Sequence, residues 1–205
     1  TVYTKDELEE LYAFCKRHQL YFYIDGARLA AALAAEEITH LTFPDMPKLC
    51  DAFYIGGTKV GAMFGEALVL VNEDFKEHFR FNMKQHGAIL AKGWMIGVQF
   101  EELFKDSLYI RLGQRSIAQM HPIKAAFEKA GIPLLCEAPT NQIFPVFPDE
   151  LAEQISKKYL TTFQCKPDKS HTCLRFCTSW ATSEEAVKDF VKDFEEMVKM
   201  YRPNK

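Results

Sequence analysis

Three short apolar runs constrain the fold of this chain more than any other feature of its sequence. They cover residues 20–24, 52–55 and 67–71, and helix-sized segments with apolar residues at helical spacing precede and follow the first run. Continuous apolar runs of this length are typical of strands in a mostly parallel sheet that helices cover on both faces. The residues up to about 120 therefore predict an α/β domain.

Capping signals and helical periodicity predict the helices around these strands. Thr4 and Glu7 have the spacing of a capping box, which predicts that a helix starts there. Apolar residues at helical spacing predict further helices over 28–37, about 84–105 and about 107–130.

The last third of the chain has a different character. A final helix is predicted after a capping box of Thr182 with Glu185. The other elements expected here are strands near 133–136, 143–147, 162–165 and 173–178, and a helix near 150–159. This pattern predicts a small α+β domain, so we expect one domain over 1–120 and a second over 121–205.

The composition excludes several classes of protein. Of the 205 residues, 48% are hydrophobic, which provides enough apolar surface for a packed core and excludes a disordered chain. The 25 basic and 28 acidic residues leave a net charge of −3, so no general basic field favours nucleic acid or an anionic membrane. No apolar run approaches the roughly 20 residues that a bilayer span needs. We expect neither nucleic-acid nor membrane partners.

The six cysteines lie mostly in apolar segments, which favours reduced thiols and a cytoplasmic location over disulfides. His171, Cys173 and Cys177 lack the paired spacing of a metal centre, so no metal site is predicted. The predicted sheet has too few strands to cover itself. We therefore expect the chain to be part of a longer protein.

Asp25 stands directly after the first apolar run. Open α/β sheets bind their ligands at the carboxyl ends of their strands, so this carboxylate is a candidate binding group. A carboxylate beside a continuous apolar run also needs a partner. Helix capping is the simpler alternative for the same residue.

Lys59 follows the second run, in the segment GGTKVG of residues 56–61. The glycines allow the backbone to approach a bulky group closely, and a lysine held there can act as a nucleophile or form an imine. The order of residues does not match a phosphate-binding Walker loop. An ordinary surface lysine is the alternative.

Arg175 is the third candidate. In the strand predicted near 173–178, alternation places Arg175 on the same face as Cys173 and Cys177. A guanidinium between two small, weakly polar side chains predicts an anionic or carboxylate partner. An exposed arginine on an edge strand is the alternative.

The three candidates follow the order found in fold-type I pyridoxal-phosphate (PLP) enzymes. The segments YIDGARL at 23–29, GGTKVG at 56–61 and LRFCTSWAT at 174–182 resemble the low-specificity L-threonine aldolase and β-eliminating lyase family. The resemblance implies PLP as the cofactor. It also implies that residues 1–120 are the C-terminal part of a PLP-binding large domain and residues 121–205 the small C-terminal domain.

The resemblance also implies roles for individual residues. Lys59 is expected to bond covalently to PLP, and Asp25 to pair with the protonated pyridine nitrogen. Arg28 is expected near the cofactor or the substrate carboxylate, and Thr58 is expected to help bind the phosphate. Arg175 is expected to hold the carboxylate of the amino-acid substrate.

The implied reaction is retro-aldol cleavage of a β-hydroxy-α-amino acid, such as L-threonine or L-allo-threonine, to glycine and an aldehyde, acetaldehyde for these two. A cytoplasmic homodimer or homotetramer is implied as well. Family members are longer at the N-terminus, so we expect this chain to lack part of the site, including the group that stacks on the ring. Two alternatives stay open: β-elimination or group transfer on the same fold, and a non-catalytic module in which Asp25 and Lys59 are structural.

Overall fold

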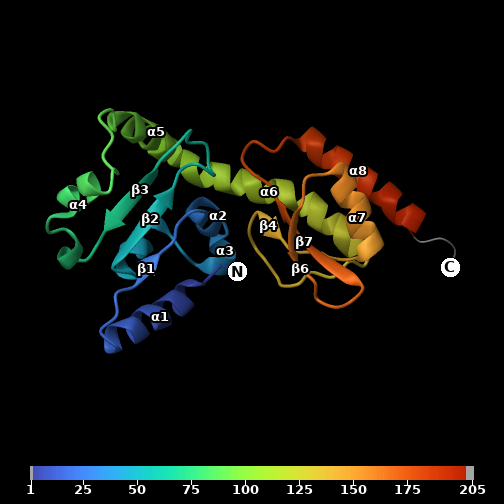
Figure 1. The fold of residues 1–205 in the computed structure, drawn as a ribbon, viewed down its shortest axis with the longest axis horizontal. Coiled ribbons are helices and arrows are strands. Elements are labelled where there is room, and N and C mark those ends of the chain that lie inside the picture. The colour runs from blue at the N-terminus through green and yellow to red at the C-terminus, as the bar shows by residue number, and fades with distance from the viewer. Residues whose placement is uncertain (1, 202–205) are drawn as a thin grey trace. The chain divides into compact units, whose positions relative to one another are not determined.

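The computed structural model describes residues 2–201, which divide into two compact units. One unit comprises residues 3–114. The other comprises Val2 and the residues from Arg115 onward, so the division falls inside the helix α6 (Leu108–Lys129). Each unit has an apolar core of its own. The elements are labelled in Figure 1, where the colour runs from blue at the N-terminus to red at the C-terminus.

The first unit contains a sheet in the order β1-β2-β3, formed by Tyr23–Ile24, Ala52–Gly56 and Glu66–Leu70. β1 pairs with β2 in parallel, and β3 pairs with β2 antiparallel. The strands predicted at 52–55 and 67–71 are confirmed within one residue, whereas the run at 20–24 contributes a strand of only two residues. The ends of β1 and β2 therefore lie next to each other.

One face of this sheet carries the core and the other carries tyrosines. Phe53 and Ile55 are buried in the core, while Tyr23, which stacks near Tyr54 on the opposite face, is 52% exposed. Burial on both faces was expected for the run at 20–24, and within the described residues that expectation is wrong. Strand alternation sends every second residue to the other face, and two of the five residues in this run are tyrosines, which tolerate water at their hydroxyl ends.

The helices of the first unit follow the capping signals better than the periodicity. The Thr4 and Glu7 capping box is confirmed, because Glu7 N–H donates to Thr4 Oγ1 at 3.3 Å and Thr4 N–H donates to Glu7 Oε2 at 2.7 Å. The single helix expected over 84–105 is wrong, since two helices stand there with Gly87 in the left-handed region at φ 71° between them. The segment 28–37 likewise forms two short helices.

The helical elements of this unit, besides the start of α6, have the following bounds: α1 Lys5–Arg17, α2 Leu29–Ala34, α3 Glu36–Thr39, α4 Phe79–Gln85 and α5 Trp94–Phe104, with the 3₁₀ turns η1 Phe43–Lys48, η2 Glu73–Phe75 and η3 Lys105–Ser107. No described helix is both long and apolar enough to cross a bilayer.

A buried carboxylate ties this unit together. Asp51, which directly precedes β2 and is 1% exposed, accepts hydrogen bonds from Phe22 N–H at 2.8 Å and from Asn72 Nδ2 at 2.9 Å. It also accepts from the ammonium of Lys16 on α1 and, at 3.5 Å, from the hydroxyl of Tyr12. Asp51 therefore links α1, the approach to β1 and the segment after β3.

The second unit is built around β7 (His171–Cys177), with which three shorter strands pair antiparallel. They are β4 Gln142–Ile143, β5 Val146–Pro148 and β6 Thr162–Cys165. The remaining helices are α7 Asp149–Lys158 and α8 Glu184–Tyr201. The strands predicted near 162–165 and 173–178 are confirmed. The stretch 143–147 forms parts of two strands, and 133–136 contributes a single bridge.

Phe127 on α6 is the centre of the second core. Its side chain is fully buried, and its ring lies 4.8–6.0 Å from the rings of four other phenylalanines on β5, β7 and α8. Their edge-to-face arrangement is the favourable one for aromatic pairs. The core thus joins the helices to one face of the strands.

The helix predicted over about 107–130 is confirmed as α6, whereas the capping box predicted for the last helix is not. α6 runs unbroken through Pro122, and its end at Gly131, φ 68°, allows Ile132 N–H to donate back to the Phe127 carbonyl at 2.9 Å. The capping box predicted at Thr182 is wrong, because Ser183 Oγ caps α8 by accepting from Ala186 N–H at 3.1 Å. Thr182 and Ser183 are adjacent hydroxyl residues, and either type can cap a helix. The backbone conformation at the start of α8 places Ser183 at the capping position.

Candidate functional site

The Asp25 side chain is held at the end of β1 by two donors. Its Oδ1 accepts a hydrogen bond from Ala27 N–H at 3.0 Å and one from the Tyr54 hydroxyl at 2.5 Å. Gly26 makes this junction possible, because a Cβ at that position would lie 1.7 Å from the Tyr54 carbonyl oxygen. Within the described residues Oδ2 has no hydrogen-bond partner.

The surroundings of Asp25 favour its charged form. The hydrogen bond from Tyr54, then that from Ala27 N–H, and the positive charges of Lys59 and Arg28 hold the pKa of the Asp25 carboxyl below its usual value. The same hydrogen bond raises the pKa of Tyr54 to about 12. At neutral pH the pair therefore consists of a carboxylate and a phenol that donates to it.

Lys59 lies in a turn that Glu66 braces. Glu66, the first residue of β3, accepts from Gly57 N–H at 2.5 Å and from the Thr58 hydroxyl at 3.0 Å. The N–H groups of Val60 and Ala62 both donate to the Gly57 carbonyl at 3.0 Å. The backbone on both sides of Lys59 is thereby fixed, while its side chain is exposed.

Two cations at this site, Lys59 and Arg28, have no partner among residues 2–201. Within the described chain, neither the Lys59 ammonium nor the Arg28 guanidinium has a hydrogen bond or ion pair, although both lie close enough to Asp25 to act on its pKa. Arg28 stands at the N-cap of α2. A carboxylate beside two uncommitted cations is suited to a ligand that carries both positive and negative groups.

Arg175 belongs to the second unit. It is half-buried on β7, and its Nη2 donates to Thr162 Oγ1 on β6 at 3.3 Å. None of the described carboxylates forms an ion pair with it. The structure thus brings Asp25, Arg28, Thr58 and Lys59 together in the first unit and describes Arg175 in the second.

Sequence reasoning missed Tyr54 and Glu66. Tyr54 alternates with the buried Phe53 and Ile55 along β2, so its side chain lies on the opposite face. The polar hydroxyl of Tyr54 was the signal in the sequence for that placement. Glu66 is a lone carboxylate at the start of an otherwise apolar run. Neither signal identifies the hydrogen-bond partner. For Tyr54 the partner is Asp25, which is 29 residues away in the sequence.

Replacing Glu66 with alanine is expected to loosen the turn that carries Lys59. Hydrogen bonds to a charged acceptor each contribute roughly 1.5–3 kcal/mol, so amide exchange at residues 57–62 should rise at least about tenfold. Hydrogen–deuterium exchange followed by mass spectrometry measures this directly. Glu73→Ala, which removes another exposed carboxylate of the same unit, is the control, and equal exchange in both variants would contradict the bracing role.

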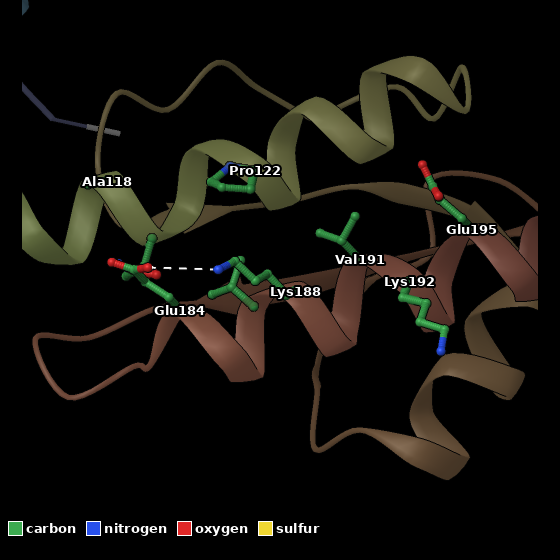
Figure 2. A pocket seen from close by; sticks show the side chains of 9 residues that line it. Ala118, Pro122, Glu184, Lys188, Val191, Lys192 and Glu195 are labelled. Carbon is green, nitrogen blue, oxygen red and sulfur yellow. Dashed lines mark ion pairs between the residues drawn. The ribbon is translucent and has the colours of Figure 1, made fainter.

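The second unit contains a groove that is separate from these residues. Figure 2 shows its walls: Ala118 and Pro122 on α6 face Glu184, Lys188, Val191, Lys192 and Glu195 on α8. The groove has a volume of about 570 Å³. Its charged rim includes the Glu184–Lys188 pair at 4.0 Å. None of the site residues predicted from the sequence lines it, so it is not the candidate site.

Comparisons with known proteins agree on one family. The sequence model of the beta-eliminating lyase family matches residues 1–150. A low specificity L-threonine aldolase from Pseudomonas aeruginosa is 28% identical over 204 residues, which is 94% of this chain and 55% of the relative. The chain therefore spans about half the length of the curated relatives it matches.

The solved structures agree on the fold. The Leishmania major threonine aldolase superimposes with a TM-score of 0.91 at 41% identity, over 96% of this chain and 57% of that one. The structure of SPT with a PLP internal aldimine matches with a TM-score of 0.64 at 13% identity, over 94% and 51% of the two chains. The predicted fold class is confirmed: the architecture is that of fold-type I PLP enzymes.

Proposed function

The chain belongs to the beta-eliminating lyase family, and on that premise we propose that it carries part of the active site of a PLP-dependent aldolase. The substrates proposed are β-hydroxy-α-amino acids such as L-threonine and L-allo-threonine, cleaved to glycine and an aldehyde. The observation that carries the proposal is the ionised Asp25 beside two cations, Lys59 and Arg28, that have no hydrogen bond or ion pair among the described residues. The two aldolases reported above support the reaction class.

The residues present fit PLP. The cofactor has a ring nitrogen that binds a proton, an aldehyde that reacts with an amine, and a phosphate, and the site offers a carboxylate, an exposed lysine and a guanidinium. The two donors to Asp25 in the described part of the chain both use Oδ1, which leaves Oδ2 for the ring nitrogen. Thr58 donates its hydroxyl hydrogen to Glu66, so its proposed contact with the phosphate stays a prediction.

When bound, PLP supplies an electron sink for the charge that develops at Cα of an amino acid. The chain's own residues do the rest. Lys59 would hold the cofactor through its exposed amine. The Asp25 carboxylate keeps the ring nitrogen protonated, because a negative charge beside that nitrogen stabilises its protonated form.

The arginines are proposed to bind carboxylate. A guanidinium binds a carboxylate with two parallel hydrogen bonds, which fixes the orientation of the substrate as well as its position. Arg175 is half-buried and has no described carboxylate partner, so it is the proposed clamp. Orientation decides which bond at Cα breaks, and for an aldolase this is the bond to Cβ.

The proposed assembly is a homodimer or homotetramer in the cytoplasm. Trp94, Met95 and Val98 on α5 expose large apolar side chains, Trp94 to 67%, whereas Phe100 and Leu103 on the same helix are buried in the core. Packing in the core therefore accounts for the apolar residues on one side of α5, but not for the exposed ones on the other side. A second copy of the chain is the proposed cover for the other side.

Product analysis tests the reaction. The chain, and any longer natural chain that contains it, is incubated with PLP and with L-threonine, L-allo-threonine or L-serine. The expected products are glycine and acetaldehyde from the threonine isomers. Ammonia and a 2-oxo acid without glycine would instead establish β-elimination, the alternative that the family's description favours.

A further inference from the structure

We propose that Tyr54 is a positioning residue for the cofactor site: its hydroxyl holds Oδ1 of Asp25, so that Oδ2 is presented to the ring nitrogen. The inference rests on the proposed function, because it assigns Asp25 to that nitrogen. Tyr54 itself contacts Asp25 and is not proposed to touch the reacting atoms.

The pairing of the strands brings Tyr54 to Asp25. The parallel register of β1 and β2 sets Ile24 beside Phe53, so the next residues, Asp25 and Tyr54, are neighbours. Gly56 N–H donates to the Gly26 carbonyl at 3.0 Å, which continues the contact past the end of β1. The backbone pairing of β1 and β2 fixes this register. It therefore places the Tyr54 hydroxyl within hydrogen-bond distance of Asp25.

The hydrogen bond decides the orientation of an otherwise mobile group. Asp25 is exposed in this chain, and a surface carboxylate rotates readily about its terminal bond. Two donors on Oδ1, Ala27 N–H and the Tyr54 hydroxyl, hold one oxygen and thereby orient the other. Without Tyr54, the Ala27 N–H would be the one remaining described donor to the Asp25 carboxylate.

Tyr23 provides a matched control. It lies on the same face of the sheet as Tyr54, and their ring centroids are 6.3 Å apart with 26° between the planes. Tyr23 makes no hydrogen bond with Asp25. Tyr54→Phe and Tyr23→Phe therefore each remove one hydroxyl from the same face, while the core residues Phe53 and Ile55 are unchanged in both variants.

The first readout needs no cofactor. The 205-residue chain is labelled with ¹³C at aspartate carboxyls, and the pKa of Asp25 is measured by NMR titration. In Tyr54→Phe the pKa of Asp25 is expected to rise toward its ordinary value of 3.8, because the largest contribution to its lowering is lost. In Tyr23→Phe it should stay at the wild-type value. An unchanged pKa in Tyr54→Phe overturns the inference.

The second readout is the affinity for PLP, measured from bound absorbance. Loss of one hydrogen bond that orients Asp25 should weaken PLP binding about tenfold in Tyr54→Phe and leave it unchanged in Tyr23→Phe. Equal affinity in the two variants overturns the positioning role even if the pKa of Asp25 rises. A wild-type chain that binds no PLP, in any longer natural form as well, overturns the proposed function itself and with it this role.

Discussion

Replacing Lys59 with alanine is expected to abolish covalent attachment of PLP and to lower the rate of substrate cleavage by roughly 10²–10⁴-fold. The amine of Lys59 is the group proposed to react with the cofactor aldehyde, and an amine positioned there can also move protons at the substrate. Alanine removes both functions. Because the Lys59 side chain is exposed and makes no described hydrogen bond or ion pair, the substitution should leave the fold intact.

The label is located by chemistry. The chain is incubated with PLP, reduced with borohydride and digested, and the pyridoxyl group is mapped by mass spectrometry. It should lie on Lys59 in preference to other lysines, and Lys48→Ala, which removes another exposed lysine of the same unit, should not change it. If the site needs a longer chain, the same test on that chain should label Lys59. Scattered labelling there would contradict the assignment.

Replacing Asp51 with alanine should strongly destabilise the first unit. Breaking a buried ion pair typically costs 3–5 kcal/mol, and here the lower end, about 3 kcal/mol, is expected because Lys16 is 42% exposed and can turn to water. The Phe22 N–H and the Asn72 amide would lose their acceptor as well. Urea unfolding followed by circular dichroism measures the loss.

The effect of Asp51 should depend on pH in a defined direction. Burial opposes the charge of Asp51, but Lys16, Phe22 N–H and Asn72 outweigh burial and hold the pKa of Asp51 below 3.8. A carboxyl whose pKa is lower in the folded chain stabilises it above the unfolded pKa, and this contribution is lost as the pH falls through the folded value. The difference between wild type and Asp51→Ala should therefore shrink below about pH 4.

A surface carboxylate serves as the control for Asp51. Glu73→Ala removes an exposed partner of Lys76 and should change neither the unfolding midpoint nor its pH dependence. An equal loss of stability in the two variants would show that Asp51 acts only as a surface charge.

Local signals in the sequence were reliable where one segment decides the outcome. The Thr4–Glu7 capping box needs only one turn of helix, and the strands at 52–55 and 67–71 follow from continuous apolar runs. The single helix expected over 84–105 was wrong because Gly87 adopts a left-handed backbone conformation that ends the helix there. The spacing of apolar residues does not reveal where a glycine will adopt a positive φ.

The sequence by itself determined the strands that end at Asp25 and precede Lys59, because apolar runs and glycines carry that information locally. Only the tertiary structure decided what those residues touch. Tyr54 meets Asp25 because β1 and β2 pair in one register, and Glu66 meets Gly57 and Thr58 because β3 returns antiparallel to β2. A shift of one residue in either pairing would send these side chains to the other face of the sheet. Register is a property of paired strands, and no single segment contains it.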